Sequence, residues 1–394
     1  MMLTLLLPLT LLAHFPLSSA LDFNWCTKTP PGFRKCGELQ QEYQSAGSVE
    51  FSCSHDLAEG GCLQEVNEEP NTVVSVNPGK LYHSQRLGGR YKVILAEDYS
   101  SAVAHTYYRY YSVAVVKAGR RHLKLLDLKG KKVCHGQYDY QGSTGWDIPI
   151  SYLYTYHRRF KMDDRCNVLD AINRYFGASC LPDSGGSITD NMRLCAACSS
   201  GTCSREVKYR GYKGAFRCLV EDAGEVAFLT HNTVSQWTDG QSTESWTAGL
   251  KSSDYRLLCP DGSQVTVDNY NQCFIGWMRP NAVVLGQDVP AGLTTKIQNS
   301  LRNPPLRAAE RIFNMDRYTQ SDEDVIFSGE TKELRIVEGR EQDPGEYLGD
   351  TVGRSYQYSY TRAMDGLYCV TGHAHTNHVN ILLISLFYVF IILF

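Results

Sequence analysis

Short apolar runs rich in β-branched residues recur along this chain, with polar and glycine-containing segments between them. They lie at residues 72–76, 91–96, 112–117 and 225–229. Such runs are typical of strands that are buried on both faces of a sheet. Residues 167–176 and 294–303 are predicted to be helices, and the polar stretch 338–349 is predicted to be a loop. Strands that alternate with helices predict an α/β fold.

The first 20 residues predict a secretory signal peptide. An apolar core from Leu3 to Leu12 precedes small residues at Ser18 and Ala20, as signal cleavage requires. Residues 371–394 form a polar spacer and a short apolar tail, which at about 1.5 Å per residue cannot cross a hydrocarbon core of about 30 Å. We therefore expect no spanning helix and a protein released from the cell. A glycolipid anchor at the cell surface is the alternative.

The charge and the cysteines narrow the class of protein. A formal charge of −3 and a pI near 6.4 argue against a nucleic-acid partner, and the lysines and arginines are interpreted as scattered along the chain. All fourteen cysteines follow the signal peptide. This even number predicts a disulfide framework formed in an oxidising compartment.

Two short motifs suggest other chemistries. Cys195 and Cys198 have the C-x-x-C spacing of redox sites, and Cys203 could add a third thiolate to a zinc site. A structural disulfide is the favoured interpretation in a secreted chain. Residues 183–186, Asp-Ser-Gly-Gly, match the nucleophile motif of trypsin-like proteases, but no histidine segment of a triad accompanies them. A turn is predicted there, and the chain is not expected to be an enzyme.

Three ordered segments carry a resemblance to a known family. They are Tyr212-Lys213-Gly214-Ala215-Phe216-Arg217-Cys218 with the run that ends at Phe228, the strand from Tyr110 to Lys117, and Lys129 to His135 leading to Gly145-Trp146-Asp147-Ile148-Pro149. In that order, they resemble the second iron-tyrosine segment, the first iron-tyrosine strand, and the turn and helix start that follow the first strand in the transferrin family. The resemblance extends from Cys26 to Cys369.

The resemblance implies a single transferrin-like lobe at residues 21–370. Its fold is α/β and resembles that of periplasmic binding proteins, with two subdomains, a cleft between them and two hinge strands. The first subdomain is expected to cover about residues 21–107 and 281–370, and the second about 108–280. The chain is expected to cross between them near Tyr107 and near Asn281.

The resemblance also supplies a pairing for the cysteines, which their spacing alone leaves open. It implies the disulfides Cys26–Cys62, Cys36–Cys53, Cys134–Cys218, Cys166–Cys369, Cys180–Cys198, Cys195–Cys203 and Cys259–Cys273.

Transferrin lobes hold ferric iron with one aspartate, two tyrosines and one histidine, beside a carbonate seated on a threonine, an arginine and a helix N-terminus. In this sequence the tyrosine positions fall on Tyr110 and Tyr212. The aspartate and histidine positions fall on Asn77 and Asn281. The threonine position falls on Gly136.

The loop between Cys134 and Trp146 contains no arginine, and the arginine position falls near Gly142. A hard trivalent cation needs anionic oxygen ligands. We therefore expect no cofactor: weak or no ferric iron, a lost carbonate seat, and the two tyrosines kept as vestigial packing residues. The helix start near Gly145 could still attract a weak anion.

Residues 166–180 resemble the melanotransferrin branch of the family. As a single secreted lobe of this branch, the whole chain is similar to a matrix protein of fish otoliths. We therefore expect a non-catalytic extracellular matrix protein that contributes to otolith growth. Its partners would be other matrix proteins or the mineral surface. The alternative is an iron-binding or iron-transport protein of melanotransferrin type, held at the cell surface by a glycolipid anchor.

Overall fold

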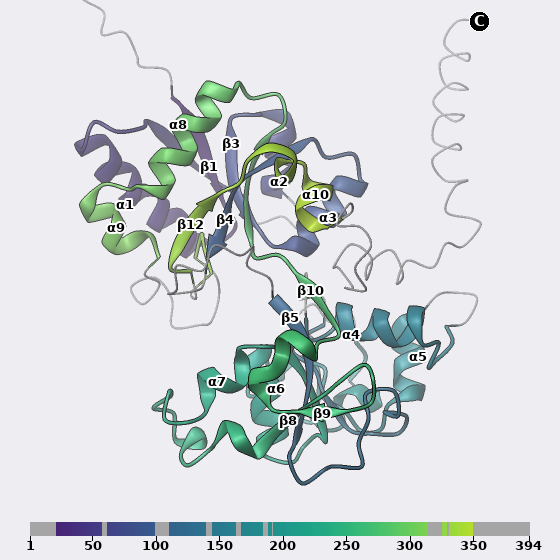
Figure 1. Cartoon of the computed structure of the whole chain (residues 1–394). Coiled ribbons are helices and arrows are strands. Elements are labelled where there is room, and N and C mark those ends of the chain that lie inside the picture. The colour runs from purple at the N-terminus through teal and green to yellow at the C-terminus, as the bar shows by residue number, and fades with distance from the viewer. Residues whose placement is uncertain are drawn as a thin grey trace, which may run out of the picture.

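Two six-stranded sheets organise the described part of the chain in the computed structural model (Figure 1). The structure describes residues 21–56, 61–98, 110–138, 144–162, 167–183, 188–190, 192–313, 325–328 and 331–349. The signal peptide, the tail at 371–394 and the first crossing near Tyr107 lie outside these ranges.

The first sheet has the strand order β12-β4-β11-β3-β1-β2. Its strands are β1 (Phe23–Thr27), β2 (Phe51–His55), β3 (Thr72–Val76), β4 (Tyr91–Asp98), β11 (Ala282–Gly286) and β12 (Glu333–Ile336). β1 is parallel to β2 and β3, whereas β11 is antiparallel to both β3 and β4. The helices of this half are α1 (Pro30–Ser45), α2 (Gly61–Glu68), α3 (Pro78–Arg86), α8 (Ala291–Arg302), α9 (Leu306–Ile312), the 3-10 helix η6 (Gly339–Gln342) and α10 (Pro344–Leu348).

Both faces of the first sheet are buried. On one face Trp25 and Phe51 belong to an apolar cluster with residues of α1, α8 and α9. On the other face Val74 and Val76 pack with residues of α2 and α3, in a cluster that continues into the second half. This double burial explains why the strands read as continuous apolar runs rather than as alternating ones.

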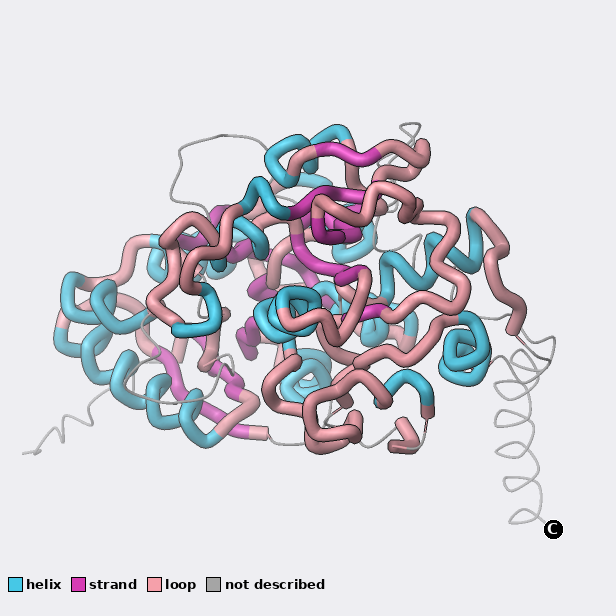
Figure 2. Tube along the Cα trace, turned by 90° about the horizontal axis from the view of Figure 1, so that it is seen from below, coloured by secondary structure: helices cyan, strands magenta, loops and turns pink. Residues whose placement is uncertain are grey.

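The second sheet has the order β6-β7-β5-β8-β9, and β10 also pairs with β5. Its strands are β5 (Tyr110–Lys117), β6 (Val133–Cys134), β7 (Val226–Thr230), β8 (Tyr255–Leu258), β9 (Gln264–Val265) and β10 (Gly276–Met278). The helices are α4 (Asp147–Ser151), a π-helical turn η1 (Tyr152–Tyr156), α5 (Val168–Tyr175), η2 (Arg193–Cys195), α6 (Gly211–Val220), α7 (Thr233–Trp237), η3 (Ser245–Thr247), η4 (Ser252–Asp254) and η5 (Val267–Gln272). Figure 2 shows the same arrangement from below, with helices and loops around the strands.

The second crossing between the halves lies between β10 and β11. β10 pairs with β5 of the second sheet, and β11 inserts between β3 and β4 of the first. Residues 279–281 therefore carry the chain from one half to the other (Figure 1). This is the two-subdomain α/β arrangement that the sequence predicts.

The predicted strands and helices are confirmed, with boundaries that shift by a few residues. β3 matches its prediction, β4 and β5 are each two residues longer, and the two predicted helices are α5 and α8. The predicted loop at 338–349 is wrong, because it contains η6 and α10. Asp343 caps α10 by accepting from the Glu346 amide, and Gly349 ends it with a φ of 105°. Because the segment 338–349 is polar, the Asp-Pro pair that starts this helix and the glycine that ends it were interpreted as loop residues.

Candidate functional site

Tyr110 is the first residue of β5, opposite Met278 of β10. Its side chain is buried, and its ring centroid lies 6.3 Å from that of His231. β10 leads directly into the second crossing. Tyr110 is thus part of the strand pair at which the two halves of the chain are joined.

Tyr212 is the second residue of α6 and is half-buried. Its hydroxyl accepts a hydrogen bond from the Thr144 amide at 3.1 Å. The Thr144 carbonyl in turn accepts from the hydroxyl of Ser112, on β5, at 2.6 Å. Thr144 therefore links the strand that carries Tyr110 to the helix that carries Tyr212, so the structure brings the two tyrosines into one hydrogen-bonded frame.

The ring of Tyr212 packs against the glycines where the carbonate seat was expected. A Cβ added at Gly136 would lie 3.4 Å from the ring, and one at Gly145 would lie 2.9 Å from the Phe228 carbonyl oxygen. Position 145 therefore has no room for a side chain. Gly142, the expected arginine position, lies outside the described residues.

His135 lies fully buried beside these glycines. Burial lowers the pKa of its imidazole to about 4, so the ring is neutral at physiological pH. One ring nitrogen, Nδ1, lies 3.3 Å from the Gly145 carbonyl oxygen and donates to it. Trp146, Phe176 and Phe228 surround the ring. His135 is thus a packed histidine of the core.

Asn77 occupies the expected aspartate position and caps a helix. It precedes α3, its φ and ψ of −78° and 160° are those of an N-cap, and its side-chain oxygen accepts from the Lys80 amide at 2.8 Å. Pro78 follows in the first turn. The side chain at this position is therefore a neutral amide whose oxygen already has a structural partner.

Asn281, at the expected histidine position, lies on the second crossing. Val76 pairs with Ala282 in the β3–β11 ladder, so Asn77 and Asn281 are the next residues in register beyond the end of that ladder. The main-chain carbonyl of Asn281 accepts from the Glu97 amide at 2.9 Å. The structure thus brings the two asparagines to one edge of the first sheet.

His231 is a residue near the site that the sequence did not single out. It follows β7, and its ring contacts Tyr110, Tyr111 and Tyr270. Its Nδ1 accepts from the Tyr111 amide at 3.3 Å, and burial lowers its pKa to about 4. In this tautomer Nε2 carries the proton, so neither nitrogen offers a lone pair to a metal ion.

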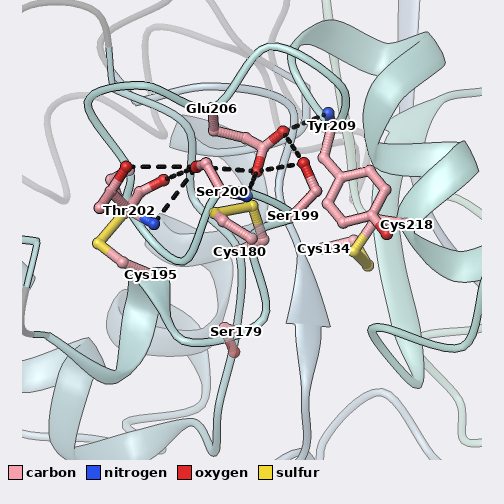
Figure 3. The surroundings of a disulfide bond; sticks show 12 residues. Cys134, Ser179, Cys180, Cys195, Ser199, Ser200, Thr202, Glu206, Tyr209 and Cys218 are labelled. Atoms are coloured by element: carbon pink, nitrogen blue, oxygen red, sulfur yellow. Dashed lines mark hydrogen bonds between the residues drawn. A yellow bond between two sulfur atoms is a disulfide. The ribbon is translucent and has the colours of Figure 1, made fainter.

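The C-x-x-C motif belongs to two different disulfides. The structure pairs Cys180 with Cys198 and Cys195 with Cys203, as Figure 3 illustrates for the surroundings of these bonds. Sulfur atoms of Cys180 and Cys198 and a carboxylate oxygen of Glu206 lie within 4.8 Å of one another. Because the two sulfurs are bonded to each other, neither is available as a zinc or redox thiolate.

Glu206 instead organises the neighbouring loop. Its carboxylate accepts hydrogen bonds from the Ser199 hydroxyl, the Ser200 amide and the Tyr209 amide (Figure 3). Burial opposes ionisation of Glu206, but these hydrogen bonds outweigh it and lower the pKa of the carboxyl. The polar cluster is a structural one.

Among the cysteines that the structure describes, six disulfides have the pairing that the resemblance implies. They are Cys26–Cys62, Cys36–Cys53, Cys134–Cys218, Cys180–Cys198, Cys195–Cys203 and Cys259–Cys273. The expected pair Cys166–Cys369 lies outside the described residues.

The protease-like motif is only partly described. Ser184, Gly185 and Gly186 fall outside the described residues. Asp183 is buried, and its carboxylate accepts from the Ile188 amide at 2.6 Å. In the described parts of the chain no helix is long and apolar enough to cross a membrane.

Comparison with known proteins decides the family. The transferrin family model matches residues 23–367. The chain belongs to the transferrin family. It is 32% identical to melanotransferrin of Homo sapiens over 368 residues, which covers 91% of this chain and 47% of that protein. Transferrin of Blaberus discoidalis is 30% identical, with 73% and 40% of the two chains covered. Serotransferrin of Gadus morhua is 29% identical, with 79% and 48% covered.

The chain thus spans about half the length of the curated relatives it matches. Its donor set does not fit the ferric ion of a transferrin lobe. Positions 77 and 281 offer neutral amides in place of a carboxylate and an imidazole, and Asn77 already caps α3. A hard trivalent cation selects anionic oxygens, so the two tyrosines would have to supply nearly all the charge.

Proposed function

We propose that this chain is a secreted, non-catalytic transferrin lobe with a degenerate iron site, which works in the extracellular matrix of the otolith. In this role it contributes to otolith growth and to assembly of the mineral matrix. Its partners are other matrix proteins or the mineral surface. It uses no cofactor.

The observation that carries the proposal is the role of Asn77. The side chain at the aspartate position caps the first turn of α3 and supplies no negative charge for a ferric ion. Asn281 and Gly136 likewise lack the groups that a ferric ion and its carbonate need. A lobe that keeps its disulfides and sheets but not these groups is suited to a structural role.

The resemblance of this single lobe to otolith matrix protein supports the choice of matrix. The predicted signal peptide supports entry into the secretory pathway. The alternative is an iron-binding protein of melanotransferrin type on a glycolipid anchor. Retention of Tyr110 and Tyr212 is the observation that favours it.

A ferric titration separates the two functions. Purified mature protein mixed with ferric citrate and bicarbonate should develop little visible absorbance from tyrosinate-to-iron charge transfer. A strong band that disappears in both Tyr110→Phe and Tyr212→Phe would establish the carrier instead. Tyr255→Phe serves as the matched control, because Tyr255 is a buried tyrosine of β8 that pairs with Lys117, at the end of β5 opposite to Tyr110.

The matrix role needs its own test. Antibody labelling of the inner ear should place the protein within the otolith matrix, and its removal from the animal should reduce otolith growth. Normal otoliths in its absence would refute the matrix role. Release from transfected cells only by phosphatidylinositol-specific phospholipase would favour the anchored alternative.

A further inference from the structure

A dense group of cations lies between β5 and β6. Seven of the sixteen residues from Lys117 to Lys132 are lysine or arginine, and Asp127 is the one acidic residue among them. This corrects the interpretation of the basic residues as scattered. Figure 1 shows the segment as the blue loop along the lower edge of the second half, on the side away from the first sheet.

Two of these cations are neutralised by neighbours. Lys117 pairs with Asp222 at 2.7 Å, and Arg120 pairs with Glu225 at 3.2 Å. The other five, together with His122, form what we term the basic loop: Arg121, His122, Lys124, Lys129, Lys131 and Lys132. All but the half-buried Lys131 are exposed. No carboxylate within the described residues lies at ion-pair distance from any of them.

Buried leucines fix the basic loop in place. Leu123, Leu125 and Leu128 alternate with the cations and are almost completely buried. When these three side chains enter the core, the basic residues between them are left on the surface. The backbone is therefore anchored at several points along the segment.

Hydrogen bonds to neighbouring elements hold the same segment. The side-chain amide of Gln264, on β9, donates to the carbonyls of Arg120 and Leu123 at 3.1 and 2.8 Å. The Gly130 amide donates to the Tyr175 carbonyl at the end of α5, at 2.8 Å. Arg174, which precedes Tyr175 on α5, is also exposed. A preorganised row of cations loses little chain entropy when it binds.

We propose that the basic loop is a binding surface for a sulfated polysaccharide of the extracellular matrix. A protein of net charge −3 has no general attraction for polyanions, so this local surface must supply the recognition. Sulfate groups spaced along a flexible chain can each meet one lysine or arginine of an extended row. The choice of a sulfated polysaccharide rests on the extracellular location proposed above.

The test compares two variants with the same net charge. In the first, Arg121→Gln, Lys124→Gln, Lys129→Gln and Lys132→Gln are combined. In the control, four exposed cations elsewhere are replaced: Lys251→Gln, Arg307→Gln, Lys332→Gln and Arg340→Gln. A third variant, with Lys124→Arg, Lys129→Arg and Lys132→Arg, keeps the charge. Equal circular dichroism spectra establish that all three are folded.

The probe is a heparin decasaccharide, with a desulfated decasaccharide of equal length beside it. Since an exposed ion pair contributes roughly a factor of two, the first variant should bind heparin at least about tenfold more weakly. The control and the arginine variant should stay within about twofold of the parent. Binding by the parent should weaken as NaCl rises.

Three results would overturn the proposal. They are no heparin binding by the parent, equal binding of the sulfated and desulfated chains, and equal loss in the two glutamine variants. Displacement of heparin by phosphatidylserine vesicles or duplex DNA at lower charge concentration would assign the surface to a membrane or a nucleic acid. Any of these results leaves the iron titration and the otolith labelling unaffected, so this failure is separate from failure of the proposed function.

Discussion

The two halves of the chain differ in the roles of the side chains at the positions where the family resemblance places iron ligands. On the second half, Tyr110 and Tyr212 belong to a frame of strand pairing, ring packing and a hydrogen bond through Thr144. On the first half, Asn77 and Asn281 stand beyond the end of the β3–β11 ladder. Two of the positions expected to hold ligands carry tyrosines that also pack, and the other two carry neutral asparagines, of which Asn77 caps a helix.

Tyrosines at two ligand positions of the family therefore do not by themselves establish iron binding, because such tyrosines can also be kept for packing. A buried tyrosine can be kept for its ring, since large-to-small changes in a core cost several kcal/mol. An N-cap can be an asparagine or an aspartate with little effect on the helix. A lobe can therefore lose its charged donors without losing its fold.

The largest expected effect is on ferric affinity, when an aspartate and a histidine replace the two asparagines of the first half. Combining Asn77→Asp with Asn281→His should raise ferric affinity roughly a thousandfold, because one charge pair at about 4 Å contributes about 4 kcal/mol at an effective dielectric of about 20. Competition with citrate, followed by the charge-transfer band, measures this. Asn77→Ser, which caps without charge, is the matched control. An unchanged affinity would mean that the anion seat, and not these donors, limits binding.

The next largest effect is expected on the stability of the second half, when a methyl group is added at Gly145. Gly145→Ala places a methyl group 2.9 Å from the Phe228 carbonyl and 3.3 Å from the Tyr212 ring, and we expect it to destabilise the fold by about 2–3 kcal/mol. Urea unfolding measures the loss. Gly119→Ala, whose added Cβ meets nothing within 4 Å, should have little effect. Equal stability of the two variants would contradict a close-packed frame around Tyr212.

The buried carboxylate of Glu206 should make the second half sensitive to acid. Because its folded-state pKa is lowered, its stabilising contribution is present above the unfolded pKa of about 4.3 and is lost as the pH falls through the folded pKa. Glu206→Gln should cost about 1–2 kcal/mol at pH 7. Urea midpoints at pH 7 and pH 3 should converge between parent and variant. A constant difference would exclude ionisation of Glu206 as the cause.

The smallest effect concerns the helix cap. Asn77→Ala should destabilise the chain by about 1 kcal/mol, because the Lys80 amide loses its acceptor, whereas Asn77→Asp should be nearly neutral. Thermal unfolding of both variants measures this. If alanine is tolerated as well as aspartate, Asn77 has some role other than capping.

Much of the fold could be predicted from local pattern. Continuous apolar runs predict buried strands such as β3, and helical periodicity predicts α5 and α8. α10 was missed because its five residues are too few for periodicity and its caps were read as loop residues. The family membership, and with it the two-subdomain fold, came from the ordered tyrosine and glycine segments.

The site was predictable as a set of positions but not as a set of contacts. Asn77-Pro78 is a helix-start signal in the sequence, but the sequence analysis considered Asn77 only as a ligand position of the family. His231 carries no local motif, and its tautomer depends on the Tyr111 amide of another strand. The interpretation of the basic residues as scattered overlooked the basic loop, whose exposure depends on which leucines enter the core.

The second crossing has a consequence for the order in which the chain can fold during synthesis. The second half, from β5 to β10, is one uninterrupted stretch, and every described strand of its sheet is synthesised before β11. The first sheet stays incomplete until β11 and β12 arrive, and the crossing at Pro280 receives its hydrogen bond from the Tyr347 hydroxyl only when α10 is made. The half that holds the tyrosines can therefore mature first, and the last described helix fastens the other half to it.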